Sequence, residues 1–403
     1  MKAYQRLINY TAYEAASDEN SPAQPSTPSQ LEFGKALVEE MKALGISDAE
    51  IDEHGYVYGS IPANVENAPV IGFIAHMDVV DDVNYKNIKA SVVENYDGGD
   101  IVLNKEKNIV MSPNEYESLK KYVGNDLVVS DGTTLIGADD RAGVAEIMTA
   151  AEIILGDPTI RHGKIAIGFT PDEEIGRGAL KFDVKKFGAD FAYTLDGAAF
   201  GEVTYETFNA AAAKIKVVGK NIHPGSAKNK MKNAQLIAME FASMLPQAEK
   251  PEYTEKYEGF YHLTEMKGTV EEAEMSWILR DHDSEKLEIK KRTVENAAEF
   301  LNKKYGQGTV TADISDTYRN MAEKVLEHPE VLEKAFKAVE KAGGTPFSSP
   351  MRGGTDGATL SFMGLPCPNL GTGSHNHHGT FEYASVQAMD KCVEVILNIL
   401  TVE

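Results

Sequence analysis

The chain has 403 residues, of which 42% are hydrophobic, and it carries a formal net charge of −22. This length exceeds what one hydrophobic core usually supports, so we expect two domains. The negative charge repels the phosphates of nucleic acids and anionic lipid surfaces, and neither is expected as a partner. Its two cysteines are too few for a disulfide framework. Without a signal-peptide pattern or a stretch of 18 apolar residues, the sequence predicts a cytoplasmic protein that does not enter membranes.

In the first half of the chain, short apolar runs alternate with helical patterns. A capping-box pattern from Ser29 to Glu32 predicts the start of a helix that Gly45 ends. Another helix is expected over 142–155. Strands are expected at 55–61, 69–75, 164–170 and 191–195. This alternation predicts an α/β domain with a central, mostly parallel mixed sheet flanked by helices. In such sheets, ligands collect beyond the carboxyl ends of the strands.

From about residue 207 the pattern changes to β-α-β-α-β. Strands are expected at 210–219, 271–281 and 308–316, with helices near 231–244 and 284–304. This order predicts an inserted α+β lid domain with an antiparallel sheet over 207–320. The catalytic domain is then discontinuous and consists of 1–206 and 321–403.

The chain after this insertion is expected to return to the first domain. A helix is predicted over 322–342, and a Gly-rich segment at 353–373 is predicted to hold a short strand. A last helix is predicted from about Tyr383 to Leu400.

Side chains that can bind metals follow the apolar runs or lie in Gly-rich loops. They are His76, Asp78, Asp139, Glu173, Glu174, Asp196 and a histidine of the 375–378 segment. Imidazole and carboxylate ligands without cysteine suit a hydrolytic zinc pair. Because the carboxyl ends of parallel strands share one edge of the sheet, we expect these side chains to gather there.

Each of these signals alone also fits a structural role. Asp139 and Asp140 are good helix N-caps, the acidic pair Glu173-Glu174 suits a solvated loop, and Asp196-Gly197 is a common turn. Spacing does not decide which histidine of the 375–378 segment is a ligand. Independent turns would not each present a ligand at the same edge, however, so the combination predicts a metal site.

Other chemistries lack their motifs. The sequence contains no G-x-x-x-x-G-K-[ST] phosphate loop, no G-x-S-x-G nucleophile elbow and no H-E-x-x-H zinc helix. Phosphoryl transfer and serine hydrolysis are therefore not expected.

Along nearly its whole length the chain resembles the M20 family of dinuclear zinc peptidases, and most closely the tripeptide aminopeptidases among them. The resemblance lies in long, specific blocks: HMDVV at 76–80, GADDRAGVAEIM at 137–148, FTPDEEIGRG at 169–178, YEGFYHL at 257–263, MRGGTDG at 351–357 and HHGTFEY at 377–383.

The resemblance implies roles for the predicted site residues. One zinc site would use His76 and Asp196, and the other Glu174 and His378, with Asp139 bridging the two. Asp78 would orient the His76 ring, and Glu173 would be the general base. His375 and His377, beside the ligand His378, would be structural.

The resemblance also implies substrate-binding residues outside the metal cluster. Arg352 would bind the carboxylate of the peptide, because a planar guanidinium offers a bidentate match. His223 resembles the family histidine that stabilises the oxyanion, and Asn233 and Arg280 match weaker positions of the lid domain.

The expected protein is a zinc-dependent aminopeptidase with two Zn²⁺ per subunit that removes the first residue of tripeptides with a free N-terminus. A homodimer is possible. Two alternatives stay open. Another M20-type hydrolase, such as a dipeptidase, carboxypeptidase or deacylase, would share every metal residue. A non-catalytic peptide-binding protein would not need Glu173.

Overall fold

The computed structural model describes residues 1–402 and divides them into two compact units. The first unit consists of Met1–Tyr205, Glu323–Ser349 and the chain from Thr355 onward. The second unit consists of Glu206–Ala322 and the short segment Pro350–Gly354. The second unit thus contains nearly the predicted inserted domain, 207–320, and in addition Pro350–Gly354, which was predicted to lie in the other domain.

The first unit is built around a seven-stranded sheet of order β1-β2-β8-β3-β9-β15-β10. The strands are β1 (Glu50–Ile51), β2 (Val57–Ile61), β3 (Ile71–His76), β8 (Ile165–Thr170), β9 (Phe191–Gly197), β10 (Val203–Thr204) and β15 (Asn369–Gly371). The central pairs, β8 with β3, β3 with β9 and β9 with β15, are parallel, whereas the pairs toward both edges are antiparallel. The buried runs predicted as strands therefore form the middle of a mixed sheet.

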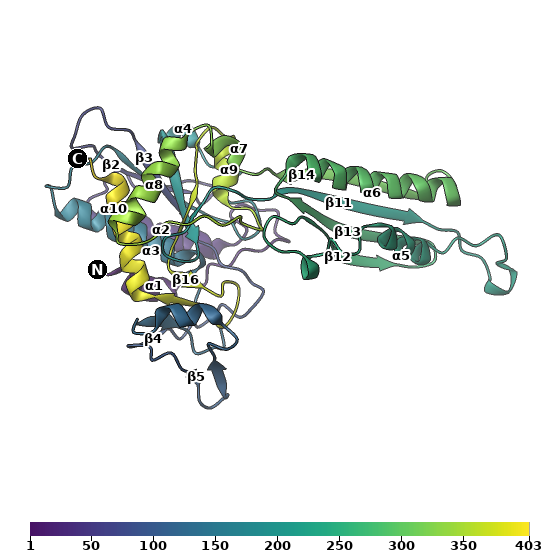
Figure 1. Cartoon of the computed structure of the whole chain (residues 1–403), viewed down its shortest axis with the longest axis horizontal. Helices are drawn as coiled ribbons and strands as arrows, with labels where there is room; N and C mark the ends of the chain where they lie inside the picture. Colours follow the sequence, from purple (N-terminus) through teal and green to yellow (C-terminus); the bar gives the residue numbers. More distant parts are fainter. Residues whose placement is uncertain (403) are drawn as a thin grey trace. The chain divides into compact units, whose positions relative to one another are not determined.

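Helices cover both faces of this sheet (Figure 1). Phe73 packs among residues of α3 (Ala138–Gly156) and α10 (Val386–Leu400). Its neighbours in the strand point the other way. A Cβ at Gly72 would lie 2.4 Å from the Phe187 ring of α4 (Val184–Phe187), so only glycine allows this close approach. Ile74 belongs to the same cluster as Leu360 of α9 (Asp356–Phe362).

The remaining elements of the first unit surround this core. They are the helices α1 (Ala3–Tyr10), α2 (Pro28–Leu44), α7 (Ala322–Val325, which begins in the second unit) and α8 (Pro329–Lys341), and the 3₁₀ helix η1 (Glu117–Tyr122). A four-stranded sheet has the order β16-β17-β7-β4. Its strands are β4 (Ser91–Val93), β7 (Leu127–Val129), β16 (Ser374–His375) and β17 (Tyr383–Ser385), and β5 (Ile101–Asn104) pairs with β6 (Ile109–Met111). The sequence indicated none of these small strands.

Three predicted helix boundaries are wrong. Helix α2 begins at Pro28 after Thr27, because proline suits the first helical turn, so Ser29 lies inside the helix. The single helix predicted over 322–342 is two helices, α7 and α8, with a break before Pro329. The last helix begins at Val386, because Tyr383 is paired with Val129 in the small sheet.

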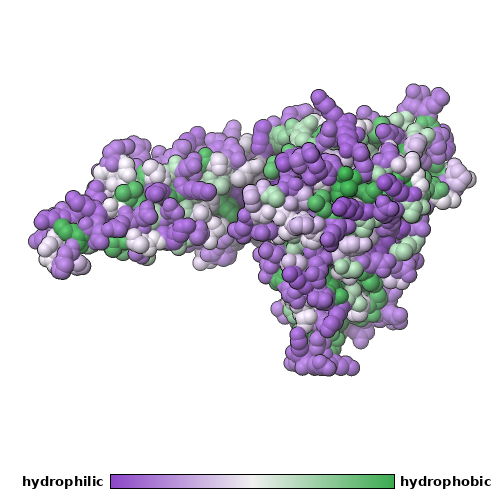
Figure 2. Space-filling model, turned by 180° about the vertical axis from the view of Figure 1, so that it is seen from behind, coloured by the Kyte–Doolittle hydropathy of each residue, from purple (hydrophilic) through white to green (hydrophobic). Residues whose placement is uncertain are grey.

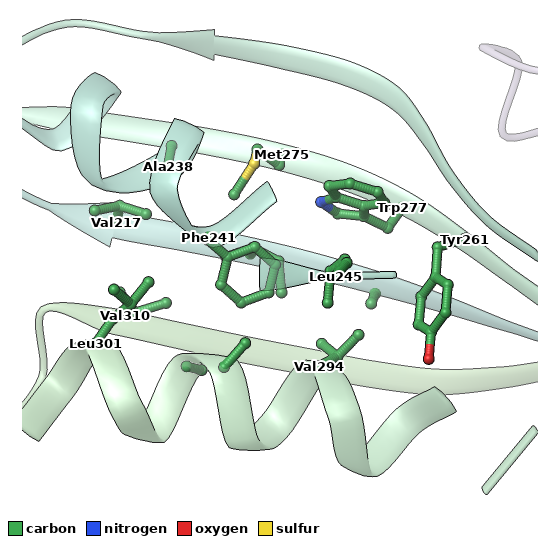
Figure 3. Close-up of a cluster of buried hydrophobic side chains, with 14 of the residues drawn as sticks. Val217, Ala238, Phe241, Leu245, Tyr261, Met275, Trp277, Val294, Leu301 and Val310 are labelled. Atoms are coloured by element: carbon green, nitrogen blue, oxygen red, sulfur yellow. The ribbon is translucent and has the colours of Figure 1, made fainter. Parts of the chain in front are cut away.

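The second unit is an antiparallel sheet with two helices. The strand order is β12-β13-β11-β14, from β11 (Asn209–Val218), β12 (Phe260–Gly268), β13 (Glu272–Asp281) and β14 (Val310–Tyr318). Strand β12 was not predicted, and short 3₁₀ turns lie at Pro224–Ser226 (η2) and Pro251–Tyr253 (η3). Helices α5 (Ala234–Met244) and α6 (Ser284–Tyr305) pack on the face of the sheet that carries Met275 and Trp277, as Figure 3 shows.

The exposed surface agrees with the charge of the chain. The face drawn in Figure 2 is largely hydrophilic, with apolar residues scattered in small groups. Among residues 1–402, no helix has the length and apolar character needed to span a bilayer.

We expect Phe241→Ala to lower the free energy of unfolding of the second unit by about 3–5 kcal/mol, because the Phe241 ring is fully buried in its core. Leu236→Ala, on the exposed side of the same helix, is the matched control and should change it by less than about 0.5 kcal/mol. Urea unfolding followed by fluorescence measures both, since the only tryptophan, Trp277, lies in this core. Equal costs for the two variants would contradict the packing.

Candidate metal centre

The site begins at the ends of two neighbouring parallel strands. His76 is the last residue of β3, and Asp196 lies near the end of β9. Because these strands pair in parallel, their side chains emerge at the same edge of the sheet. The His76 Nε2 atom lies 3.4 Å from an Asp196 carboxylate oxygen. The Asp196 carboxylate is also held by the Thr355 hydroxyl, which donates to it at 3.0 Å.

Asp139 lies between two histidines. One carboxylate oxygen is 2.9 Å from His76 Nε2, and the other is 3.1 Å from His378 Nε2. The backbone of Asp139 is fixed in turn, because its N–H donates to the buried Glu382 carboxylate at 2.9 Å. A carboxylate that presents one oxygen to each side has the geometry of a bridging ligand.

The acidic pair Glu173-Glu174 follows strand β8. The Glu174 carboxylate lies 3.0 Å from His378 Nε2. The Glu173 carboxylate lies 3.9 Å from His76 Nε2 and makes no hydrogen bond with a described residue. The two glutamates therefore face the same cluster, but only Glu174 is in close contact with a histidine, and the Glu173 carboxylate has no hydrogen-bond partner among residues 1–402.

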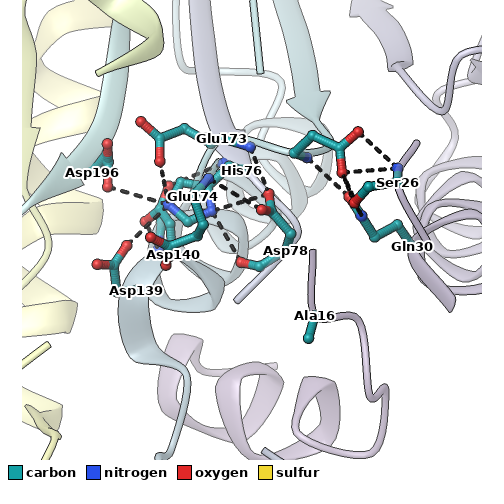
Figure 4. A network of polar contacts seen from close by, with 12 residues as sticks. Ala16, Ser26, Gln30, His76, Asp78, Asp139, Asp140, Glu173, Glu174 and Asp196 are labelled. Carbon is teal, nitrogen blue, oxygen red and sulfur yellow. Dashed lines mark hydrogen bonds and ion pairs between the residues drawn. The ribbon is translucent and has the colours of Figure 1, made fainter. Parts of the chain in front are cut away.

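Asp78 holds this part of the site together. Its carboxylate accepts hydrogen bonds from the backbone N–H groups of both Glu173 and Glu174, at 3.0 and 3.1 Å (Figure 4). The His76 Nδ1 atom is 3.0 Å from the main-chain carbonyl oxygen of Asp78 and 3.6 Å from its carboxylate. Asp78 thus contacts the ring mainly through its backbone, and its side chain fixes the acidic turn.

The structure gives the neighbouring histidines other partners. The His375 Nε2 atom is 2.6 Å from the Tyr122 hydroxyl, and burial lowers the pKa of His375 to about 4. His377 Nε2 is 2.8 Å from the Ser374 hydroxyl, while its Nδ1 is 3.6 Å from Asp139. Of the three, His378 is the one whose ring lies within 3.1 Å of two carboxylates.

Asp140, for which the sequence favoured a helix N-cap at least as much as a ligand, and two residues that sequence reasoning missed, Glu382 and Thr355, support the cluster. Asp140 accepts a hydrogen bond from the His76 N–H at 3.1 Å and another from Gly143 N–H, and it groups with His76 and Asp196 as a second possible ligand set. Glu382 lies in the recognised HHGTFEY block, but nothing in the local sequence shows that it reaches the amide of Asp139. Only the folded chain brings Thr355 to Asp196.

The four predicted substrate-binding residues all belong to the second unit. Asn233 caps helix α5 by accepting from Gln235 N–H at 3.0 Å. Arg280 of β13 donates to two main-chain carbonyl oxygens and lies over the Tyr318 ring. His223 accepts from Gly225 N–H through Nδ1 at 3.1 Å. Arg352 lies in the segment Pro350–Gly354. Asn233 and Arg280 thus have local structural partners, and their part in binding substrate stays a prediction.

Crowding of buried carboxylates shapes the electrostatics. Burial, together with the neighbouring Asp139, raises the pKa of Glu174 to about 8. Burial and then Asp196 raise the pKa of Glu173 well above its ordinary value. Hydrogen bonds to Asp139 and Glu174 raise the pKa of His378 to about 11. The cluster therefore retains protons that free side chains would release at neutral pH.

This arrangement fits a divalent cation. The Glu174 Oε1 atom is buried and has no hydrogen-bond partner within residues 1–402. Ligand atoms of His76, Asp139 and Glu174 all lie within 4.8 Å of one another. A cation among them would neutralise the carboxylates and would be coordinated by the unpartnered Glu174 Oε1 atom.

Comparison with known proteins identifies the relatives of this chain. Residues 205–308 match the family model described as the peptidase dimerisation domain, M20_dimer. The chain is 54% identical over 399 residues to Peptidase T of Alkaliphilus oremlandii, and the match covers 98% of each chain. It is 53% identical over 400 residues to Peptidase T of Caldanaerobacter subterraneus subsp. tengcongensis, covering 99% of this chain and 98% of the relative.

A solved structure shows the same fold. The aminopeptidase PepT from Bacillus cereus superposes with a TM-score of 0.78 at 24% identity, covering 99% of this chain and 97% of the other. The predicted fold class is therefore confirmed.

We expect the metal-free protein to lose stability as pH rises from about 5 to about 8. The pKa of Glu174 is raised from 4.5 to about 8 in the folded state, so its stabilising contribution is complete below pH 4.5 and is lost as pH rises through 8. The raised pKa of His378 acts in the same direction at higher pH. Thermal unfolding in a chelator at several pH values measures the effect.

Added Zn²⁺ should prevent this loss of stability at higher pH by binding the deprotonated cluster. Glu174→Gln should make the Tm of the metal-free protein depend less on pH. A Tm that stays constant or rises with pH in the chelator would contradict the raised pKa of Glu174.

Proposed function

Because the chain belongs to the peptidase T family of M20 peptidases, we propose that it removes the N-terminal residue of tripeptides by metal-dependent hydrolysis. The membership confirms the family and the enzyme class predicted from the sequence: the chain is a hydrolase, an aminopeptidase. The observation that carries the proposal is the Asp139 carboxylate between His76 and His378, with the unbonded Glu173 beside them.

The proposed cofactor is two Zn²⁺ per subunit. His76 and Asp196 would hold one ion, Glu174 and His378 the other, and Asp139 would bind both. The short contacts within each group and the two oxygens of Asp139 support this division. When bound, a zinc pair lowers the pKa of a shared water and polarises the scissile carbonyl.

Glu173 is the proposed general base. Its carboxylate faces the cluster but has no hydrogen-bond partner among the described residues, whereas Glu174 contacts His378. Its backbone N–H is held by Asp78, so the turn that carries it is fixed. Glu173 would accept the proton of the attacking water and return it to the leaving amine.

His223 is the proposed oxyanion donor. Its Nδ1 accepts a hydrogen bond from Gly225 N–H, which places the ring proton on Nε2. Nε2 makes no hydrogen bond with a described residue, so it is available to donate to a developing oxyanion. Arg352 is the proposed partner of the peptide's carboxylate, and Asn233 and Arg280 complete the proposed set.

The proposal extends to assembly and location. The match of residues 205–308 to a peptidase dimerisation domain supports a homodimer. A cytoplasmic location, where short peptides with free N-termini are the substrates, is part of the same proposal.

We expect Glu173→Gln to retain its metal and to lower kcat by at least about a hundredfold, because the amide cannot accept the water's proton. Metal analysis and steady-state kinetics on the same sample measure both quantities. Glu53→Gln is the control and should leave kcat unchanged, since the Glu53 side chain is 87% exposed. Unchanged turnover in Glu173→Gln would remove this residue as the base.

Mass-spectrometric product analysis of zinc-loaded protein tests the activity itself. A free tripeptide should yield its first residue and a dipeptide, and its N-acetylated twin should stay intact. Release of the C-terminal residue, or of the acetyl group, would assign the site to another M20-type hydrolase. Binding without any cleavage would favour a peptide-binding protein.

A further inference from the structure

Arg352 is held in the second unit without a carboxylate partner. The chain has 62 acidic and 40 basic residues, yet Arg352 makes no ion pair with a described residue. Its guanidinium instead donates through Nη1 to the carbonyl oxygens of Lys256 and Glu258, at 3.0 and 2.7 Å. A third hydrogen bond runs from Nη2 to the Thr254 hydroxyl at 2.8 Å.

These bonds leave one edge of the guanidinium unused. The group has five N–H donors. Two on Nη1 and one on Nη2 are taken by the loop Thr254–Glu258, which leaves Nε–H and one N–H of Nη2. Nε and Nη2 are neighbouring nitrogens, and together they form an edge that binds a carboxylate with two parallel hydrogen bonds.

Packing fixes the plane of the guanidinium. It lies 5.1 Å from the centre of the Phe208 ring and 5.5 Å from that of Phe260, within the range of cation–π contact. The backbone beside it is held as well, because His282 Nε2 lies 3.1 Å from the carbonyl oxygen of Met351. Arg352 is therefore oriented before any ligand arrives.

The Thr254 hydroxyl restricts the rotation of the Arg352 guanidinium within its plane. Its hydroxyl donates to the carbonyl oxygen of Lys250 at 3.0 Å, so its one proton is already used. Toward Arg352 the hydroxyl can therefore only accept. The hydroxyl oxygen therefore accepts the hydrogen bond that Arg352 Nη2 donates.

We propose that Thr254 is a positioning residue that turns the Nε–Nη2 edge of Arg352 toward the terminal carboxylate of the peptide, and so determines the preference for peptides with a free C-terminus. The inference rests on the proposed function, in which Arg352 binds that carboxylate. It adds a residue that does not touch the substrate and acts only through Arg352.

The expected effect of Thr254→Val is on substrate affinity. Valine keeps the shape of threonine but offers no acceptor, so the guanidinium loses one of its three anchors. KM for a free tripeptide should rise about tenfold, the usual scale for one hydrogen bond to a charged group. Because the carboxylate contact is the same before and during the reaction, kcat should stay unchanged.

The test measures kcat and KM of the zinc-loaded protein with a tripeptide and with its C-terminal amide. The wild type should prefer the free acid, Thr254→Val should lose most of that preference, and Thr254→Ser, which keeps the hydroxyl, should retain it. Thr264→Val is the matched control, because the Thr264 side chain is exposed on β12 and bonds only to the Ser276 carbonyl oxygen.

The outcomes separate the two levels of the proposal. If the wild type cleaves acid and amide equally well, the assignment of Arg352 to the carboxylate fails, and the role of Thr254 fails with it. If the wild type prefers the acid but Thr254→Val retains that preference, only the role of Thr254 is overturned. A fall in kcat for both substrates in Thr254→Val, or a failure of Thr254→Ser to restore KM, would also overturn it, because it would show a general structural defect.

Discussion

The site depends on the placement of one carboxylate. Asp139 faces His76, which is 63 residues away in sequence, and His378, which is 239 residues away. Its amide is anchored by Glu382, which approaches from the segment that carries His378. If Asp139 shifted, the two histidines would no longer share a partner and the cluster would divide into unrelated ion pairs. Strand β3, the start of helix α3 and the loop before β17 are positioned to satisfy this one contact.

This arrangement gathers like charges where water is largely excluded. Burial raises the pKa of Glu173, Glu174 and Asp196, so the metal-free cluster holds protons against the ordinary preference of carboxylates. The Thr355 hydroxyl stabilises one oxygen of Asp196, and the backbone amides of Glu173 and Glu174 stabilise both oxygens of the neighbouring Asp78 carboxylate. Positive charge supplied by bound cations would remove the crowding, and metal binding would then be coupled to the stability of the first unit.

The second unit holds two hydrogen-bond donor side chains in fixed orientations. His223 and Arg352 are each held by neighbouring groups through some of their nitrogen atoms, and each keeps others unused. If these residues bind the peptide as proposed, such preorganisation lowers the entropy lost on binding, and recognition depends on the groups that hold the contacting side chains. Thr254 is of this kind, since its effect on a ligand passes through Arg352.

The sequence by itself determined the buried strands that carry His76 and Asp196, because continuous apolar runs and strand-to-turn changes are local patterns. Its long motif blocks also determined the family. It missed β12, the small strands around β7 and the break before Pro329, since edge pairing and local breaks depend on neighbours that no local pattern shows. Only the tertiary structure decided that the Asp78 carboxylate holds the Glu173-Glu174 turn, that Glu382 anchors Asp139 and that Thr254 faces Arg352. Each of these contacts joins segments far apart in sequence, and their meeting is fixed by how the sheets and helices pack.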